Sequence, residues 1–411
     1  MSKRNLTALF SLLAAGSLLL AACGGGATPA AEEPTAEAEQ PTAEAPAAGL
    51  TFGLVLVGPQ NDHGWSQAHY EGGQYVVDNM PGAEMIVFES LNPADKPEAT
   101  LEGVVSDMVS QGATLIITTS DEFEEDTKTV AESHPDITFI NASGDDALTG
   151  EAPANLGNIM GRMEDMKAIA GCAAALSTQT GQIGYLGPLI NFETRRLASS
   201  AYLGAKYCYE NYRGLDPADL QFTVTWIGFW FNIPGVTLDP TEVTTNFIDT
   251  GVDVVMSGID TTEGIDVTGQ RAAAGDAVLA VPYDYLGACD NAPEVCLGVP
   301  FFSWGPAYLE TAQAVADGSW TQSWDWNGAN WDALSDPSAT NVGWVSGAAL
   351  SAEASASLDE FIAMLASGGS VWAGPINLQD GSEYIAAGAV ATDEQIWYLP
   401  QLLEGMEGPS E

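Results

Sequence analysis

Residues 50–80 read LTFGLVLVGPQNDHGWSQAHYEGGQYVVDNM, and they set the pattern of the fold. The apolar run at 50–57 is typical of a buried strand, and the segment that starts at Asn61 has the spacing of a helix. A strand that is followed at once by a helix is the repeating unit of a parallel sheet covered by helices. If this unit recurs along the chain, the protein belongs to the α/β class.

The strand–helix unit does recur, in two series. Further strands are predicted at 83–88, 115–119 and 137–141, with helices at 100–111 and 122–133. After residue 160 the rhythm restarts, with strands at 182–186, 222–227, 252–257 and 278–281 and helices at 163–176, 194–211, 241–250 and 267–274. Two such series predict an α/β fold of two doubly wound, Rossmann-like lobes joined by a hinge, with a cleft between them.

The predicted boundaries follow from these two series. Residues 1–23 are expected to be a signal segment and 24–49 a linker. Lobe 1 covers 50–160 with a return segment near 301–320, and lobe 2 covers 161–300 with much of 321–411.

The first 49 residues are expected to lie outside the fold. Lys3 and Arg4 precede a short apolar stretch, which is typical of a secretory signal. The sequence LAACG at 20–24 resembles the lipobox of bacterial lipoproteins, which implies a lipid anchor on Cys23. An ordinary signal with a chance cysteine is the alternative. Residues 24–49 hold no large apolar side chain, so they are interpreted as a solvated, disordered spacer.

The charge excludes one class of partner. Only 11 Lys and Arg stand against 56 Asp and Glu, which gives a formal charge of −45. Such a surface repels phosphate backbones, so we expect no nucleic-acid partner. An anionic small ligand would need a local basic patch, and few basic residues exist to build one.

Four cysteines besides Cys23 suggest disulfides. In an oxidising compartment an even number permits two bridges, with three possible connectivities. Cys289 and Cys296 bracket a short loop and form the natural local pair, whereas Cys172 and Cys208 would pair if their helices pack side by side. A zinc site is the alternative, but the chain has no CxxC spacing.

Polar and aromatic residues follow the predicted strands, where ligands bind in open parallel sheets. The candidates are Asn61, Asp62, Trp65, Ser120, Asp121, Trp230, Phe231, Asp260 and Asp284. Aromatic rings stack on flat ligands, and ionised carboxylates accept hydrogen bonds from N–H and O–H groups. For each aspartate the alternative is a helix N-cap at a strand–helix turn. Trp226 and Phe229 are interpreted as core residues.

Catalytic patterns are missing from the sequence. It has no GxSxG, P-loop or GxGxxG motif, and its histidines are His63, His69 and His134. His63 and His69 are spaced closely enough to be weighed as metal ligands, but no cysteine lies near them. We therefore expect a protein that is not an enzyme and that carries no metal or cofactor.

Four stretches together are more specific than any one alone. They are NDHGWSQ at 61–67 with YEG at 70–72, STQTGQIGY at 177–185, GVDVV at 251–255 ahead of Asp260, and WGPAY at 304–308. In these stretches the chain resembles the basic membrane protein (BMP) family of ABC-transporter substrate-binding lipoproteins, which has the type I periplasmic-binding-protein fold. The resemblance runs from about residue 50 to about residue 347.

The resemblance implies a flat heterocyclic ligand, such as a purine nucleoside, a purine base or a flavin. It places Asn61, Asp62, Trp65, Asp121 and Asp260 at the ligand, with Trp65 where phenylalanine is commoner. Nucleoside-binding members also use a lysine in the second lobe. Here that region offers only Arg271, and the nearest strand end carries Asp284 instead.

These observations converge on one expectation. We expect an extracytoplasmic, lipid-anchored monomer whose lobes close on a purine nucleoside or related heterocycle and which delivers this ligand to an ABC-transporter permease. A sugar-binding protein of an ABC importer is the nearer alternative, because aromatic rings and carboxylates also suit sugars. A ligand-presenting sensor or adaptor for a signalling receptor is the other.

Overall fold

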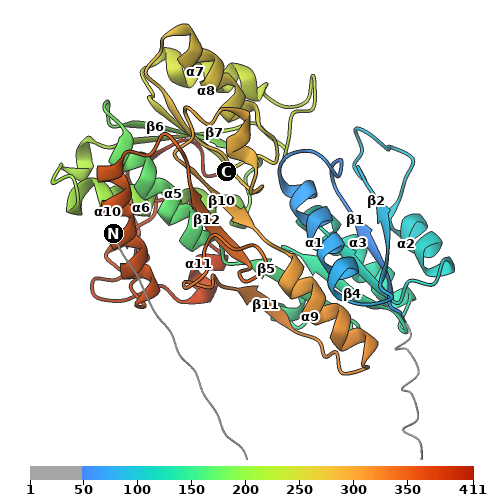
Figure 1. The fold of residues 1–411 in the computed structure, drawn as a ribbon. Coiled ribbons are helices and arrows are strands. Elements are labelled where there is room, and N and C mark those ends of the chain that lie inside the picture. Colours follow the sequence, from blue (N-terminus) through green and yellow to red (C-terminus); the bar gives the residue numbers. More distant parts are fainter. Residues whose placement is uncertain (1–48) are drawn as a thin grey trace, which may run out of the picture. The chain divides into compact units, whose positions relative to one another are not determined.

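A computed structural model describes residues 49–411, and these residues belong to one compact unit (Figure 1). The expectations for the signal segment, for Cys23 and for nearly all of the linker lie outside the described residues. From residue 50 to residue 281, strands and helices alternate largely as expected from the sequence, and the elements at Asp146–Thr149 and Leu156–Gly161 are two that were not predicted.

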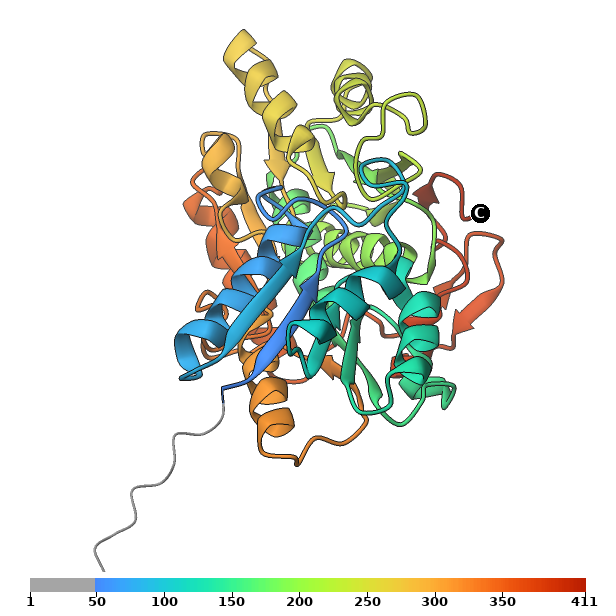
Figure 2. The ribbon, with the colours of Figure 1, turned by 90° about the vertical axis from the view of Figure 1, so that its right-hand side faces the viewer.

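The first lobe contains a six-stranded sheet in which every strand is parallel to its neighbours. In spatial order its strands are β11 (Trp324–Asn327), β5 (Leu156–Gly161), β4 (Thr138–Ala142), β3 (Leu115–Thr118), β1 (Thr51–Val55) and β2 (Glu84–Phe88). The helices between them are α1 (Trp65–Asn79), α2 (Leu101–Ser110), α3 (Glu124–Ser133) and the short α4 (Asp146–Thr149), with a 3-10 turn η1 (Asp121–Phe123). Figure 2 shows β1, β2 and α1, all in blue, side by side.

The second lobe contains a five-stranded parallel sheet. Its strands are β15 (Met406–Glu407), β7 (Gln221–Trp226), β6 (Gln182–Gly187), β8 (Val254–Ser257) and β9 (Leu279–Val281). Its helices are α5 (Met163–Ser177), α6 (Phe192–Asn211), α7 (Pro240–Asp249) and α8 (Glu263–Ala274), with the turns η2 (Pro217–Asp219) and η3 (Ala288–Asn291). Two parallel sheets with helices between their strands confirm the predicted α/β class.

Three segments of the chain connect the two sheets. The first runs from β5 to α5. The second leads from β10 (Gly298–Phe302) to α9 (Gly305–Ala316), and α9 packs on α1. The third leads from β11, which pairs with β5, to β12 (Val342–Ser346), which pairs antiparallel with β10.

The C-terminal stretch, which gave no clear pattern in the sequence, is ordered. Helix α10 (Ala352–Ala366) packs on α5 of the second lobe. The short elements β13 (Ile376–Asn377), β14 (Glu383–Ile385) and α11 (Asp393–Trp397) follow, and α11 contacts α6. The chain then returns as β15 to the edge of the second sheet.

Helices α5 and α6 pack unusually closely because glycines face backbone across the interface. A Cβ atom on Gly171 would lie 1.8 Å from the carbonyl oxygen of Ala201, and one on Gly204 would lie 2.0 Å from that of Ala168. A disulfide joins Cys172 of α5 to Cys208 of α6 at the same interface. A second disulfide joins Cys289 to Cys296. Both pairs are those expected from the sequence.

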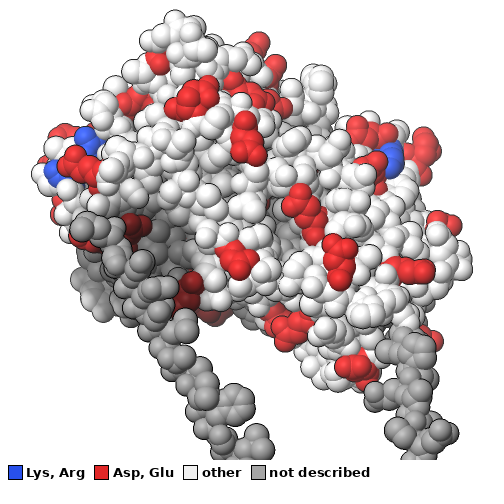
Figure 3. All heavy atoms as spheres, viewed as in Figure 1, with Lys and Arg blue, Asp and Glu red and all other residues white. Residues whose placement is uncertain are grey.

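The surface carries the acidity of the composition. Figure 3 shows acidic side chains spread over the visible face, with only a few basic ones between them. None of the helices within residues 49–411 is both long and apolar enough to cross a membrane.

Candidate ligand-binding site

One cavity lies at the carboxyl ends of the strands and is lined by residues of both lobes. From the first lobe come Trp65, Ser120, Asp121 and Ser143. The second lobe contributes the aromatic residues Tyr185, Trp230 and Tyr283, the polar residues Glu193, Thr194 and Asp260, and also Pro188, Leu197 and Gly258. The space between these side chains amounts to about 390 Å³ when the open solvent at its mouth is included, but only about 10 Å³ of it admits the centre of a water molecule, so the side chains nearly fill the cavity. The location is the one that the rule for parallel sheets predicts.

Asp121 and Glu193 approach the cavity from opposite lobes. Asp121 begins η1, and its Oδ2 accepts a hydrogen bond of 2.7 Å from the Asn191 amide at the start of α6. Glu193 lies in the first turn of α6 and accepts a hydrogen bond of 2.7 Å from the Ser143 hydroxyl of the first lobe. Burial, reinforced by the charge of Glu193, raises the pKa of Asp121 to about 8. Burial also raises the pKa of Glu193, against the opposing effect of Arg196.

Asp260 is the most isolated carboxylate in the cavity. Its side chain is only 4% exposed, and its backbone N–H donates to the Trp230 carbonyl at 3.0 Å. Within residues 49–411 no hydrogen bond reaches its carboxylate. Burial, with the nearby charge of Asp284 as the next cause, raises its pKa well above the ordinary range.

Asp284 lies behind the cavity wall and is fully buried. Its backbone adopts a left-handed conformation (φ 69°), and neither of its carboxylate oxygens has a hydrogen-bond partner among the described residues. Burial raises its pKa, and the positive charge of Lys167 opposes that shift. Asp284 therefore depends on Lys167 for electrostatic compensation.

Lys167 is a buried cation that the sequence did not reveal as part of this region. Its ammonium group donates to the Ser257 carbonyl at 2.7 Å and lies 3.2 Å from the ring centroid of Tyr283. Burial lowers its pKa to about 7 although Asp284 acts in the opposite direction. The expectation that this region offers only Arg271 is wrong, because α5 brings Lys167 to the end of β8. Arg271 pairs instead with Asp249 and Asp276 at the far end of α8.

Asp62 serves mainly to start a helix. Its carboxylate accepts hydrogen bonds of 2.9 Å from the backbone N–H groups of Gly64, Ser66 and Gln67, at the N-terminus of α1. Burial raises its pKa and these N–H groups oppose the shift. The alternative of a helix-capping aspartate thus describes Asp62 well. Its neighbour Asn61 is exposed.

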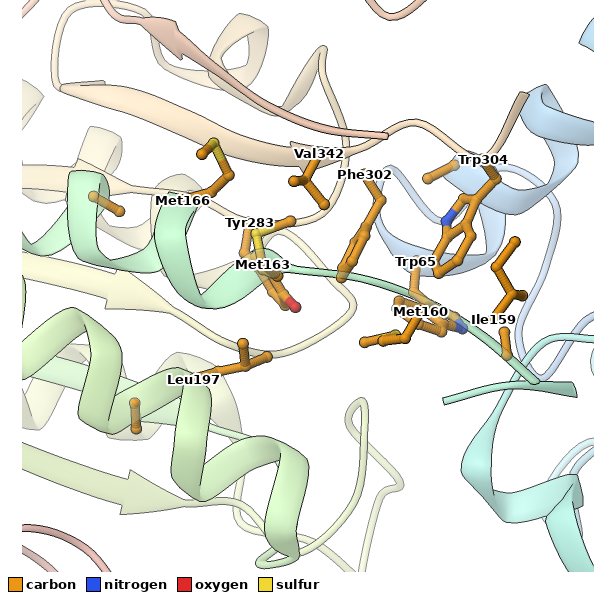
Figure 4. Close-up of a cluster of buried hydrophobic side chains, with 14 of the residues drawn as sticks. Trp65, Ile159, Met160, Met163, Met166, Leu197, Tyr283, Phe302, Trp304 and Val342 are labelled. Carbon is orange, nitrogen blue, oxygen red and sulfur yellow. The ribbon is translucent and has the colours of Figure 1, made fainter. Parts of the chain in front are cut away.

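The aromatic residues divide into those that line the cavity and those that do not. Trp65 lines it, and its indole N–H donates to the Thr119 carbonyl at 2.5 Å. Figure 4 shows Trp65 beside Phe302 and Trp304, and its ring meets theirs edge to face at 5.2 and 5.4 Å. Trp230 lines the cavity from the second lobe, whereas Phe231 packs edge to face on Phe229 outside it.

His69 is part of the packed core rather than a candidate metal site. His69 is buried, stacks on Trp304 at 4.1 Å and lies 2.5 Å from the Tyr308 hydroxyl through its Nδ1. Within residues 49–411, no group of three or more His, Cys, Asp or Glu side chains could hold a metal ion. Trp226 is buried, as expected of a core residue, and donates to the Pro409 carbonyl.

Five of the nine predicted site residues line the cavity, namely Trp65, Ser120, Asp121, Trp230 and Asp260. Asn61, Asp62, Phe231 and Asp284 do not, and a role for them in binding stays a prediction. The sequence prediction left out Ser143, Tyr185, Glu193, Leu197 and Tyr283. Ser143 and Tyr283 come soon after strands, so their position after a strand could have identified them. Glu193 and Leu197 lie in the first turns of α6, the helix that follows β6, so a search of the first turns of such helices could have identified these two.

The two lobes touch at Gly64. A Cβ atom on Gly64 would lie 1.7 Å from the backbone carbonyl oxygen of Asp260. Glycine at this position therefore permits the backbone of the first lobe to rest against that of the second. Together with the hydrogen bonds Asn191–Asp121 and Ser143–Glu193, this contact describes lobes that are closed around the cavity.

Comparison with known proteins gives two kinds of likeness. Residues 50–284 match the family model described as ABC transporter substrate-binding protein PnrA-like. A purine-binding protein of Brucella abortus (strain 2308) is 28% identical over 361 residues, which cover 87% of this chain and 93% of that protein. A putative ABC transporter glucose-binding protein of Haloferax volcanii is 28% identical over 280 residues, which cover 67% of this chain and 63% of that protein.

A solved structure extends the likeness to the fold. An ABC transporter solute-binding protein from Aeropyrum pernix K1 superimposes with a TM-score of 0.62 at 14% identity, covering 86% of this chain and 100% of that one. This similarity supports the two-lobed architecture and says nothing about the ligand.

Proposed function

Because the chain belongs to the Bmp family of PnrA-like ABC transporter substrate-binding proteins, we propose that it binds a purine nucleoside or a related flat heterocycle between its lobes. The resemblance seen in the sequence is thereby confirmed, and so is the expectation of a binding protein rather than an enzyme. Binding proteins of ABC importers act outside the cytoplasm and hand a small molecule to a permease. The ligand itself is the new element of the proposal.

The observation that carries the proposal is the pairing of aromatic rings with carboxylates in one cavity. Trp65 comes from the first lobe and Trp230 from the second, so each lobe offers one indole to a flat ring bound in the cavity. Stacking of this kind suits any heterocycle with a π-face. A purine-binding relative that covers most of the chain supports the same class of ligand.

The carboxylates account for orientation and selectivity. Asp121 and Asp260 accept hydrogen bonds, so they suit the ring N–H groups or ribose hydroxyls of a nucleoside. A ligand that lacks such donors would leave buried acceptors without partners, which is unfavourable. The site therefore favours ligands that are rich in donors.

Closure of the lobes is the conformational change by which a permease can distinguish the ligand-bound protein from the free protein. A ligand shifts an open–closed equilibrium only if it binds the closed form better. Asp121 and Trp65 lie on one lobe and Asp260 and Trp230 on the other, so a ligand touching all four favours closure. We propose that the closed form docks on the permease as a monomer, held at the membrane by lipid on Cys23.

A sugar is the second candidate, favoured by the glucose-binding relative from Haloferax volcanii. Aromatic faces and carboxylates also suit a sugar ring with several hydroxyl groups. A sensor that presents the closed lobes to a receptor uses the same site and differs only in the partner. Ligand-dependent uptake in vesicles that contain an ABC-transporter permease able to dock this protein would separate transport from sensing.

The test is a panel of melting temperatures. Guanosine, adenosine, hypoxanthine, riboflavin and glucose are added to the purified protein at saturating concentration. A ligand at 100 times its Kd stabilises the folded state by about 2.7 kcal/mol, which is a readily measured shift. We expect a purine or flavin to give it, and glucose alone giving it would replace the proposal by the second candidate.

A pair of variants ties the shift to the cavity. Asp121→Ala should abolish the shift because it removes a carboxylate that lines the site. Asp78→Ala is the matched control, since Asp78 is exposed on α1. An unchanged response of Asp121→Ala would remove Asp121 from the site.

A further inference from the structure

The ionisable groups that line the cavity are unbalanced. Asp121, Glu193 and Asp260 are among its lining residues, whereas no lysine or arginine is. This imbalance is not the acidity of the surface, because Glu193 and Asp260 are 6% and 4% exposed. A buried carboxylate normally has a cation beside it or several N–H donors around it.

Two of the carboxylates in this region have a cation nearby. Glu193 lies 4.0 Å from the Arg196 guanidinium, which also pairs with Glu164 at 2.6 Å. Asp284 is compensated by Lys167. Arg195, the third buried basic residue among those described, donates instead to the backbone carbonyls of Leu399 and Ser410.

Asp121 and Asp260 are left without compensation. No ion pair within residues 49–411 involves either of them. Among the described residues, Asp121 accepts hydrogen bonds from uncharged groups, namely the Asn191 amide, the Ser120 hydroxyl and the Glu122 backbone N–H, and the Asp260 carboxylate accepts none. After burial, the nearby charges of four carboxylates raise the pKa of Asp260 further, namely those of Asp284, Asp62, Glu193 and Asp121. Asp260 is thus a nearly buried residue that lines a cavity and whose carboxylate has neither a hydrogen-bond nor an ion-pair partner within residues 49–411.

The aromatic residues of the cavity favour a positively charged ligand, which would balance the unpaired carboxylates. Trp65, Tyr185, Trp230 and Tyr283 line it, and the faces of such rings attract cations. Tyr283 already has the amino group of Lys167 at 3.2 Å from its ring centroid, so the ring does accept a basic group at its face. Aromatic faces combined with unpaired carboxylates form a suitable environment for an organic cation.

The geometry points to a ligand that carries a positive charge on or next to its flat ring, with the charge located between Asp121 and Asp260. This inference rests on the proposed function and narrows it from heterocycles in general to cationic ones. A neutral purine would supply hydrogen-bond donors but would leave the two carboxylates without a counter-charge. A cationic heterocycle supplies both.

The test compares nucleosides that differ in charge and little else. Methylation of N7 makes the guanine ring cationic at pH 6, and methylation of N1 does the same for adenine. Calorimetric titration of the purified protein would use guanosine with 7-methylguanosine and adenosine with 1-methyladenosine. We expect the cationic member of at least one pair to bind at least tenfold more tightly than the neutral member.

Proton release gives an independent readout. A cation between Asp121 and Asp260 favours their ionised forms, so its binding should release protons. The binding enthalpy measured in two buffers of different ionisation enthalpy should then differ, and it should differ less for guanosine.

Variants locate the charge. Asp260→Asn should weaken binding of both members, because Asp260 lines the site, and the loss for the cationic member should be at least tenfold greater than the loss for the neutral member. Asp290→Asn, at an exposed position of the same lobe, is the matched control. A melting curve for each variant without ligand verifies that it is folded.

Failure of the cationic members to bind more tightly overturns the inference in every case. If guanosine or adenosine then binds, the proposed function stands without it. If glucose alone binds, both the inference and the proposed function are overturned.

Discussion

Asp62 and Asp260 face the same contact between the lobes, and both follow a strand of a parallel sheet, yet their surroundings are opposite. Asp62 accepts three backbone hydrogen bonds at the start of α1. Asp260 is almost fully buried and accepts none among the described residues. The first carboxylate is satisfied by its own lobe, and the second is available to a ligand. Position after a strand therefore brings an aspartate to the cleft without deciding whether it serves folding or binding.

The largest loss of ligand affinity is expected from a substitution at Gly64, where the first lobe touches the backbone of Asp260 in the second lobe. Gly64→Ala should lower ligand affinity at least about 100-fold, or about 2.7 kcal/mol, because a Cβ atom there collides with the Asp260 carbonyl and keeps the lobes apart. Titration calorimetry measures the affinity, and small-angle scattering measures the expected larger radius of gyration. Gly264→Ala is the control, since its Cβ would make only ordinary contacts, the nearest at 3.6 Å. Normal closure of Gly64→Ala would contradict the contact.

Exchanging each aspartate for asparagine tests the comparison directly. Asp62→Asn should lower the free energy of unfolding by about 1–2 kcal/mol, because an amide group cannot accept all three hydrogen bonds. Asp260→Asn should leave the stability of the unliganded protein nearly unchanged at neutral pH, because burial keeps this carboxyl group protonated and an amide has the same shape, and it should weaken ligand binding instead. Urea unfolding and calorimetry report the two quantities. If Asp260→Asn were the more destabilising change, the division of roles would be wrong.

Much of the fold follows from local sequence patterns, and less of the site does. Most strands and helices up to 281 were predictable because apolar runs and helix boundaries are local signals, but strand β5 of the first sheet was missed. Among the elements after β9, helix α9 was expected near 301–320 as a return to the first lobe, and it does pack on α1. Strands β11 and β15 pair with the distant strands β5 and β7, so no local signal assigns them. Lys167 was missed for the same reason, because it reaches Ser257 across 90 residues of sequence.

The adjacent residues Trp230 and Phe231 test whether lining the cavity, rather than packing beside it, determines ligand affinity. Trp230→Ala should weaken binding about tenfold, because stacking of a base on an aromatic ring contributes about 1–3 kcal/mol. Phe231→Ala should change it less than about twofold, since Phe231 packs on Phe229 outside the cavity. Calorimetry with any ligand found by the panel measures both. Equal losses at the two positions would mean that the whole loop reaches the ligand.

The smallest expected effect is on the pH dependence of stability and involves Asp121. This carboxylate has fewer hydrogen-bond partners than Asp62 and more than Asp260. Its pKa is raised from 3.8 to about 8 by burial, so the folded state binds more protons than the unfolded state between those values. Stability without ligand should therefore fall as the pH rises from about 4 to about 8. Asp121→Asn should make that slope shallower, as measured by melting temperature across this range, and Asp78→Asn should not. A slope unchanged in Asp121→Asn would place the titrating group elsewhere.

The three segments that connect the sheets limit how the protein can move. A single flexible tether would let the lobes slide, twist and separate independently, whereas three tethers side by side must all bend together. Bending together leaves essentially one rotation, about an axis that runs across the three segments. The transporter then has one mechanical coordinate to sense, an angle, whatever molecule fills the cavity. A change of ligand through mutation of the cavity can therefore evolve without a change of the signal that the permease receives.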